Sequence, residues 1–201
     1  MQRLVGAVLL IAALLLQGCG DSRLEPLSEN AVILAFGDSL TVGVGTSAEQ
    51  SYPAVLGQLS GRRVVSSGVS GEISAQGLKR LSAELARVQP NLLILLHGGN
   101  DILRNRSTTE LEGNLEAMIS LAQQQNIPVV LLGVPEKRLF SDAAPLYAAL
   151  AERHNLVFIE DLLAGLLRQP AMKSDAVHLN ARGYRVLAEG IHQVLQEEGA
   201  L

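Results

Sequence analysis

The sequence predicts one three-layer α/β/α domain, in which a doubly wound, five-stranded parallel sheet carries helices on both faces. Two observations lead to this prediction. Short continuous apolar runs, which are typical of strands buried on both faces, alternate along the chain with longer segments of helical periodicity. The length of 201 residues suits a single domain, and a hydrophobic content of 48% is sufficient for a packed core.

Five apolar runs are the expected strands, and they cover residues 31–36, 64–65, 92–96, 129–132 and 156–159. Helical patterns lie between or after them, at residues 52–59, 75–88, 109–125, 141–154 and 182–197. In the second helix, Leu78, Leu81 and Leu85 recur at spacings of three and four, which places an apolar stripe against the sheet. Parallel strands joined through helices need right-handed crossovers, so we expect helices on both faces.

The composition excludes several classes of function. The net charge is −4 and no basic block occurs, so the chain lacks the positive surface that nucleic-acid binding requires. Aromatic residues make up 3% with no Trp, which argues against stacking platforms for single-stranded nucleic acids or sugars. One cysteine excludes an intrachain disulfide, and the four histidines show no metal-ligand spacing. We therefore expect no metal, no cofactor and no nucleic-acid partner.

The segment before the first strand is expected to be an export signal followed by a polar tether. Arg3 precedes an apolar run of thirteen residues, from Leu4 to Leu16. This run is too short to cross a bilayer core, which needs about 20 residues, but it is typical of a secretory signal. The run ends in Leu16-Gln17-Gly18-Cys19, which resembles the bacterial lipoprotein signal box.

We therefore expect residues 1–18 to be a lipoprotein signal peptide, residues 19–30 to be the tether and residues 31–201 to form the domain. Cys19, the only cysteine, would carry the lipid, and its acyl chains would hold the protein on a membrane. Gly20 at the next position is similar to lipoproteins of the outer membrane, with the domain facing the periplasm. An ordinary secretory signal is the alternative.

Unusual residues follow the expected strands, at the edge of the sheet where α/β domains bind ligands. Gly-Asp-Ser-Leu at 37–40 follows the first strand, Gly71 follows the second, and His-Gly-Gly-Asn-Asp at 97–101 follows the third. Asp175 and His178 precede the last helix. Each has a plain structural alternative when taken alone: a helix cap for Ser39, and a turn for Gly71 and Asn100.

The order of these residues along the chain favours catalysis. A serine after an early strand, with Asp and His near the carboxyl end, is the order found in serine hydrolases built on an α/β sheet. His178 would remove the proton of Ser39, and Asp175 would fix the tautomer of the imidazole. The backbone N–H groups of Ser39 and Gly71 and the side-chain amide of Asn100 would form an oxyanion hole.

Gly-Asp-Ser-Leu at 37–40, Gly71, Gly-Asn-Asp at 99–101 and Asp175-x-x-His178 resemble the four blocks of the SGNH, or GDSL, hydrolase family. Residues 70–72, 98–104 and 133–135 are most similar to its bacterial acyl-CoA thioesterase/arylesterase/lysophospholipase branch. The resemblance implies a flavodoxin-like fold and a serine esterase that hydrolyses acyl esters, lysophospholipids or acyl-thioesters through an acyl-enzyme. We expect this enzyme to be a monomer.

Two positions depart from the branch. His97 stands where a less basic residue is expected, and it either contacts the substrate or packs beneath the site. Leu179 follows His178 where proline is common, which alters the loop but not the three catalytic groups.

Other polar residues are expected to have simpler roles. Asp38 is expected to hold the turn before Ser39, and His154 and His192 are expected to be ordinary surface or core residues. Lys137 and Arg138 follow the fourth strand, so they are either solvated loop charges or cations that attract an acidic head group.

Two other functions stay open at this point. One is an O-acetylesterase that acts on acetylated envelope glycans. The other is a non-catalytic lipoprotein that binds an acyl or glycan ligand, although a binding module has no need for an activated serine.

Overall fold

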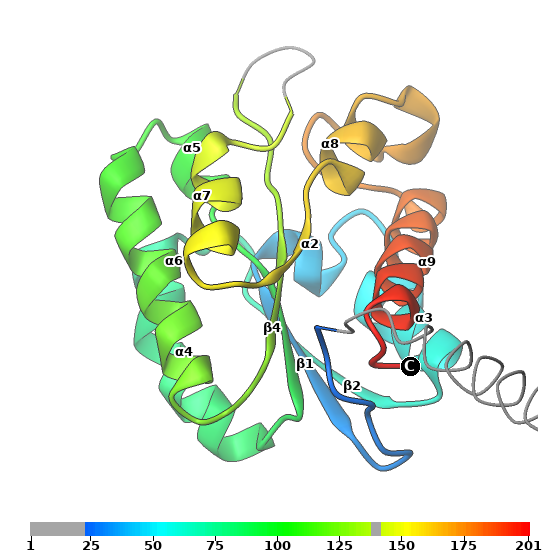
Figure 1. Cartoon of the computed structure of the whole chain (residues 1–201). Coiled ribbons are helices and arrows are strands. Elements are labelled where there is room, and N and C mark those ends of the chain that lie inside the picture. Colours follow the sequence, from blue (N-terminus) through cyan, green and yellow to red (C-terminus); the bar gives the residue numbers. More distant parts are fainter. Residues whose placement is uncertain (1–22, 138–141) are drawn as a thin grey trace, which may run out of the picture.

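The computed structural model describes residues 23–137 and 142–201, and it confirms the predicted fold class. Five parallel strands form one sheet in the order β2-β1-β3-β4-β5, the flavodoxin-like order (Figure 1). Their bounds are β1 Val32–Gly37, β2 Arg63–Gly68, β3 Leu92–Leu96, β4 Val129–Leu132 and β5 Val157–Ile159. The expected signal peptide and Cys19 lie outside the described residues.

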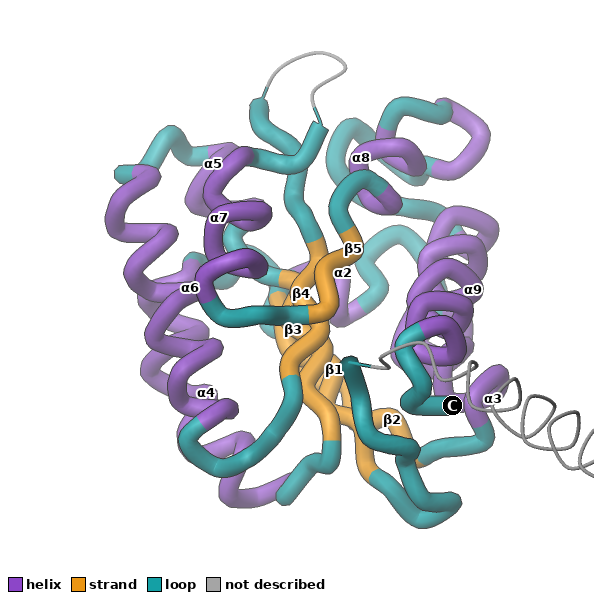
Figure 2. The backbone as a smooth tube through the Cα atoms, in the orientation of Figure 1, coloured by secondary structure: helices purple, strands orange, loops and turns teal. Residues whose placement is uncertain are grey.

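Helices cover both faces of the sheet (Figure 2). One layer holds α4 (Ser74–Val88), α6 (Thr108–Gln123) and α7 (Pro145–Arg153), and the other holds α3 (Tyr52–Ser60) and α9 (Ala181–Glu197). The described part of the chain also contains shorter helices, which are α2 (Ser39–Val42), α5 (Gly99–Leu103), α8 (Leu162–Leu167) and two 3-10 turns, Ala48–Gln50 and Pro170–Met172.

The burial of each strand follows its place in the sheet. Every residue of β3 and β4 is buried because helices cover both of their faces, whereas the edge strand β2 has exposed and half-buried positions. The three tyrosines are in the core or near it, and each hydroxyl has a partner: Tyr52 meets Thr41, Tyr147 donates to the carbonyl of His97, and Tyr184 donates to the carbonyl of Val44.

The predicted strands and long helices agree with the structure, and the differences lie at their ends. The helix expected at 141–154 is described from Pro145 to Arg153. The short helices α2, α5 and α8 were not expected, because four to six residues contain too little sequence to show a helical period. All three follow strands at the carboxyl edge of the sheet, so they surround the expected site (Figure 1).

The described part of the expected tether, residues 23–30, is packed against the domain. Arg23 forms an ion pair with Glu198 near the carboxyl terminus, and its Nη1 donates to the carbonyl of Leu156. Leu24 is buried, and its amide donates to the carbonyl of Glu198. These contacts lie next to the start of β5, at the opposite edge of the sheet from Ser39. Among the described residues, no helix is long and apolar enough to cross a membrane.

Candidate active site

Ser39 is the first residue of α2, directly beyond the end of β1. Asp38 caps this short helix, and its Oδ1 accepts a hydrogen bond of 3.1 Å from the amide of Leu40. A Cβ atom on Gly37 would overlap the carbonyl oxygen of Leu96 and the Thr41 hydroxyl, so only glycine permits this close approach to β3. The Gly-Asp-Ser-Leu segment therefore fixes a serine at the carboxyl edge of the sheet.

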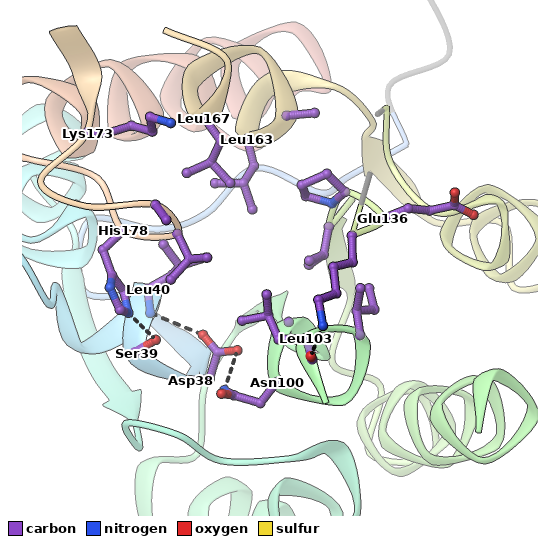
Figure 3. A pocket seen from close by; sticks show the side chains of 18 of the residues that line it. Asp38, Ser39, Leu40, Asn100, Leu103, Glu136, Leu163, Leu167, Lys173 and His178 are labelled. Atoms are coloured by element: carbon purple, nitrogen blue, oxygen red, sulfur yellow. Dashed lines mark hydrogen bonds between the residues drawn. The ribbon is translucent and has the colours of Figure 1, made fainter. Parts of the chain in front are cut away.

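A continuous chain of hydrogen bonds joins Ser39, His178 and Asp175 (Figure 3 shows the first of them). The Ser39 hydroxyl lies 3.0 Å from His178 Nε2, and His178 Nδ1 lies 2.7 Å from Asp175 Oδ2. In this arrangement Nδ1–H donates to the carboxylate, which leaves Nε2 free to accept the serine proton. The three expected catalytic residues are thus brought together with the distances that nucleophile activation requires.

The loop that carries Asp175 and His178 is held by bonds within itself. Asp175 Oδ1 accepts from the amides of Val177 and His178, at 2.8 Å each. The amide of Ser174 donates to the carbonyl of His178, which closes the loop. Partial burial raises the pKa of Asp175, but the bonds from the His178 side chain and the two amides outweigh it and lower the pKa below its ordinary value. Asp175 is therefore held as a carboxylate beside the His178 ring.

Gly71 and Asn100, the other residues expected to contribute oxyanion donors, lie at the same cavity as Ser39. Gly71 adopts a φ of 76° in the turn after β2, a region that favours glycine, and it lines the same cavity as Ser39. Asn100 lies in α5, and its Nδ2 donates to the carbonyl of Glu72 at 3.0 Å and to Asp38 Oδ2 at 3.3 Å. Both partners accept only, which fixes the orientation of the amide group.

Asp38 contacts Asn100 in addition to holding the turn before Ser39. Its side chain is buried, with one oxygen on the Leu40 amide and the other on the Asn100 amide (Figure 3). Burial raises the pKa of Asp38, and the hydrogen bond from the Leu40 amide opposes that rise. The carboxylate therefore links α2 to α5, a contact that the sequence did not indicate.

A cavity of about 440 Å³ opens beside Ser39 and His178. Its walls are mainly apolar, and they come from α5, from the loop after β4, from α8 and from the loop before α9: Ile102, Leu103, Val134, Leu163, Leu167 and Val177. Lys137, Arg168 and Lys173 also line it, and Lys137 Nζ donates to the carbonyl of Leu103 at 2.8 Å. The cavity can hold an apolar chain with one end next to the Ser39 hydroxyl (Figure 3).

Several of these residues were missed from the sequence. Leu163 and Leu167 lie on α8, and the apolar run Leu162–Leu167, which is separated from the fifth strand by two residues, was the signal that could have indicated them. His97 is fully buried and does not line the cavity, so it packs beneath the site rather than contacting substrate. Arg138 lies outside the described residues.

Within residues 23–137 and 142–201, no group of three or more His, Cys, Asp or Glu side chains is placed to hold a metal ion. His154 is at the end of α7, where it contacts Gln123 and Glu116, and it does not line the cavity.

The chain is similar to known proteins over nearly the whole length of the domain. Residues 35–186 match the model of the GDSL-like Lipase/Acylhydrolase family. Esterase TesA of Pseudomonas aeruginosa is 32% identical over 180 residues, covering 83% of this chain and 89% of the relative. The Escherichia coli strain K12 protein named thioesterase 1/protease 1/lysophospholipase L1 is 29% identical over 172 residues, covering 82% of this chain and 83% of the relative.

Solved structures agree with this relationship. The crystal structure of TesA superposes with a TM-score of 0.74 at 28% identity, covering 83% of this chain and 99% of that one. AlinE4, a SGNH-hydrolase family esterase, superposes with a TM-score of 0.67 at 32% identity, covering 85% and 97%. The chain therefore belongs to the GDSL-like lipase/acylhydrolase family and is an esterase.

Proposed function

We propose that this esterase hydrolyses acyl esters and thioesters, lysophospholipids among them, through an acyl-enzyme formed on Ser39. The observation that carries the proposal is the unbroken hydrogen-bonded chain from Ser39 through His178 to Asp175, which opens onto an apolar cavity. Relatives named esterase, thioesterase, lysophospholipase and arylesterase support the same range of substrates.

In the first half of the reaction, the Ser39 oxygen attacks the substrate carbonyl while its proton moves to His178 Nε2, 3.0 Å away. Asp175 stabilises the imidazolium that results. The carbonyl oxygen becomes an oxyanion, which receives hydrogen bonds from the amides of Ser39 and Gly71 and from Asn100. As the first residue of α2, Ser39 has an N–H group that no carbonyl of that helix accepts.

Asn100 has to exchange a partner during this step. Its two amide hydrogens are directed at the carbonyl of Glu72 and at Asp38, and the bond to Asp38 is the longer, at 3.3 Å. The oxyanion would take over this weaker bond, so the donor gains most when the substrate oxygen carries charge.

The second half of the reaction repeats the first with water. The imidazolium of His178 gives its proton to the leaving alcohol or thiol, which departs and leaves the acyl group on Ser39. Water then loses a proton to His178 and attacks the acyl carbonyl. Collapse of the second oxyanion releases the carboxylic acid and returns the proton to Ser39.

The apolar walls favour an acyl chain longer than acetyl. An acetyl group would leave most of a cavity of about 440 Å³ empty, so the Leu, Ile and Val side chains that line it would contribute little to binding. A longer acyl chain would bury its apolar surface against them. For this reason we place the O-acetylesterase function second.

Hydrolysis of nitrophenyl esters of increasing chain length tests this choice, with fluorophosphonate labelling as the test of the nucleophile. We expect faster turnover of esters longer than acetyl, labelling of the wild type and no labelling of Ser39→Ala. Turnover of acetyl esters alone would favour the O-acetylesterase, and an unlabelled wild type would favour a binding protein.

We also propose that Cys19 carries a lipid that holds the protein in the bacterial envelope, facing the periplasm. Only three residues separate Cys19 from Arg23, which packs beside the start of β5. A lipid there would keep the amino edge of the sheet near the bilayer and leave the cavity directed away from it. Cys19→Ala should lose the added lipid mass and keep its esterase activity; a wild type without lipid mass would contradict the proposal.

A further inference from the structure

A cluster of buried charged and polar groups lies beneath the oxyanion side of the site. Its centre is the Glu72 carboxylate, which is 5% exposed and follows Gly71 directly in the chain. The carbonyl of the same residue accepts the hydrogen bond of 3.0 Å from Asn100 Nδ2. Glu72 therefore joins two of the three proposed oxyanion donors, one through the peptide bond and one through a hydrogen bond.

Arg80 holds this carboxylate from α4. Its Nε lies 2.7 Å from Oε1 of Glu72, and its Nη2 lies 2.8 Å from Oε2. The same guanidinium donates to the carbonyls of Gly37 and Ser67, at 3.1 and 2.9 Å, and lies 3.9 Å from the centre of the Phe36 ring. One side chain thus connects Glu72 to the carboxyl ends of β1 and β2, and Ser39 follows β1 closely.

His97 holds the carboxylate from the end of β3. The amide of Gly98 donates to Nδ1 at 2.8 Å, so the ring proton is on Nε2, which donates to Glu72 Oε2 at 3.1 Å. This pattern requires a neutral imidazole of one tautomer. Burial raises the pKa of Glu72, but hydrogen bonds from His97 and Arg80 outweigh it and lower the pKa, so the group is a carboxylate.

We infer that Glu72, fixed by Arg80 and His97, is a positioning residue that sets the Gly71 amide and the Asn100 amide relative to Ser39. None of the three side chains lines the cavity, so they act through the donors rather than on the substrate. A buried carboxylate is seldom the most stable way to fill this space, even when it is paired, which points to placement as its role. The inference depends on the proposed oxyanion hole.

Glu72→Gln tests the inference because it keeps the shape of the side chain and removes the charge that two donors share. We expect kcat to fall by about 10–100-fold with KM changed far less, since a displacement of about 1 Å can cost about a hundredfold in rate. Glu84→Gln is the matched control: Glu84 also pairs with an arginine and with Ser67 from α4, but it touches neither Gly71 nor Asn100. Its kcat should equal that of the wild type.

A double-mutant cycle with Asn100→Ala separates positioning from general stability. If Glu72 acts through the oxyanion hole, the loss of kcat in the double variant should be clearly smaller than the product of the two single losses, because part of the effect of Glu72 passes through Asn100. Full additivity of the two losses, or a lowered Tm with unchanged kcat in the folded protein, would overturn the inference. If Glu72→Gln does not fold, Arg80→Lys enters the same cycle, because lysine keeps the charge and cannot bond all of these acceptors at once.

The control for the chemistry itself is the wild type. A wild type that the fluorophosphonate does not label at Ser39 would refute the proposed function. If the wild type is labelled and the losses of kcat in Glu72→Gln and Asn100→Ala are additive, only the positioning role is refuted.

Discussion

The two sides of the proposed active site, the base side with Asp175 and His178 and the oxyanion side with Gly71 and Asn100, are built in opposite ways. Asp175 and His178 are three residues apart in one loop, and the Asp175 side chain is 52% exposed. Ser39, Gly71 and Asn100 come from the ends of three different strands, and the buried Glu72 lies behind them. The base side is therefore made by local bonds in a solvated loop, whereas the oxyanion side depends on long-range contacts of a buried carboxylate with the partly buried Arg80 and the buried His97.

Because the two sides are built differently, substitutions on each side should affect catalysis and stability differently. A change in the loop should alter proton transfer and leave the fold intact, because the bonds of Asp175 are to its own loop. A change beneath the oxyanion side should affect both catalysis and stability, because the same groups tie β1, β2 and β3 together. Variants on the two sides should separate in this way.

The largest effect is expected for Asp175→Asn on the base side. The asparagine oxygen can still accept from the loop amides, but its NH₂ group would then face His178 Nδ1 and force the proton onto Nε2. A base with the wrong tautomer cannot take the serine proton, so kcat should fall by about 10³–10⁴. Steady-state kinetics and thermal melting should show this loss with a nearly unchanged Tm.

Combination with Ser39→Ala gives the internal control. Because groups that act as one unit have non-additive effects, the double variant should be no slower than Ser39→Ala alone. A further loss in the double variant would mean that Asp175 does not act through the serine.

Asn100→Ala should produce the next largest effect, on the oxyanion side. Removal of one oxyanion donor costs about 10²–10³ in kcat, or about 2.7–4 kcal/mol, with KM changed far less. Unlike Asp175→Asn, this variant should also lower Tm, because Asn100 ties α5 to Asp38 and to Glu72. A variant with a lowered Tm and full kcat would leave the oxyanion to the two backbone amides.

The same contrast explains what could be predicted from the sequence. The strands could be read because each is a continuous apolar run, and Asp175 and His178 could be read because their spacing is local. Arg80 could not, because an arginine on an amphipathic helix usually belongs to the solvated face. His97 was noticed beside the Gly-Gly-Asn block, but its partner Glu72 is 25 residues away and only the fold brings them together.

Gly77→Ala should perturb the buried cluster by a smaller amount. Alanine in a helix interior normally raises the free energy of unfolding by about 1 kcal/mol relative to glycine. In α4, however, the new Cβ would overlap Nε2 of His97 and lie 3.1 Å from Cε of Met118. We therefore expect the opposite sign, a loss of about 1–3 kcal/mol in urea unfolding, with a reduced kcat.

Gly113→Ala is the matched control for this substitution. Gly113 is an exposed glycine of α6, and its added Cβ would have no neighbour within 4 Å. This variant should gain about 0.5–1 kcal/mol and keep full activity. If Gly77→Ala and Gly113→Ala changed the free energy of unfolding and kcat by the same amounts, the position of His97 would not matter for stability or activity.

The smallest effect is expected in the pH dependence of stability, where the two sides differ in sign. Burial raises the pKa of Asp38, so its contribution to the free energy of unfolding is full below the unfolded pKa of about 3.9 and is lost as pH rises through the folded pKa. For Asp175, hydrogen bonds outweigh burial and lower the pKa. Its contribution is therefore present above about pH 3.9 and is lost as pH falls through the folded pKa.

Urea unfolding of the wild type, Asp38→Asn and Asp175→Asn between about pH 3 and about pH 7 measures both contributions. As pH rises, the stability of the wild type relative to Asp38→Asn should decrease, since the variant carries no buried carboxyl group that must ionise. Over the same range, the stability of the wild type relative to Asp175→Asn should increase, by a small amount because that carboxylate is half exposed and screened by water. If both stability differences, wild type minus Asp38→Asn and wild type minus Asp175→Asn, changed in the same direction with pH, the pKa values of Asp38 and Asp175 would not be shifted in opposite directions.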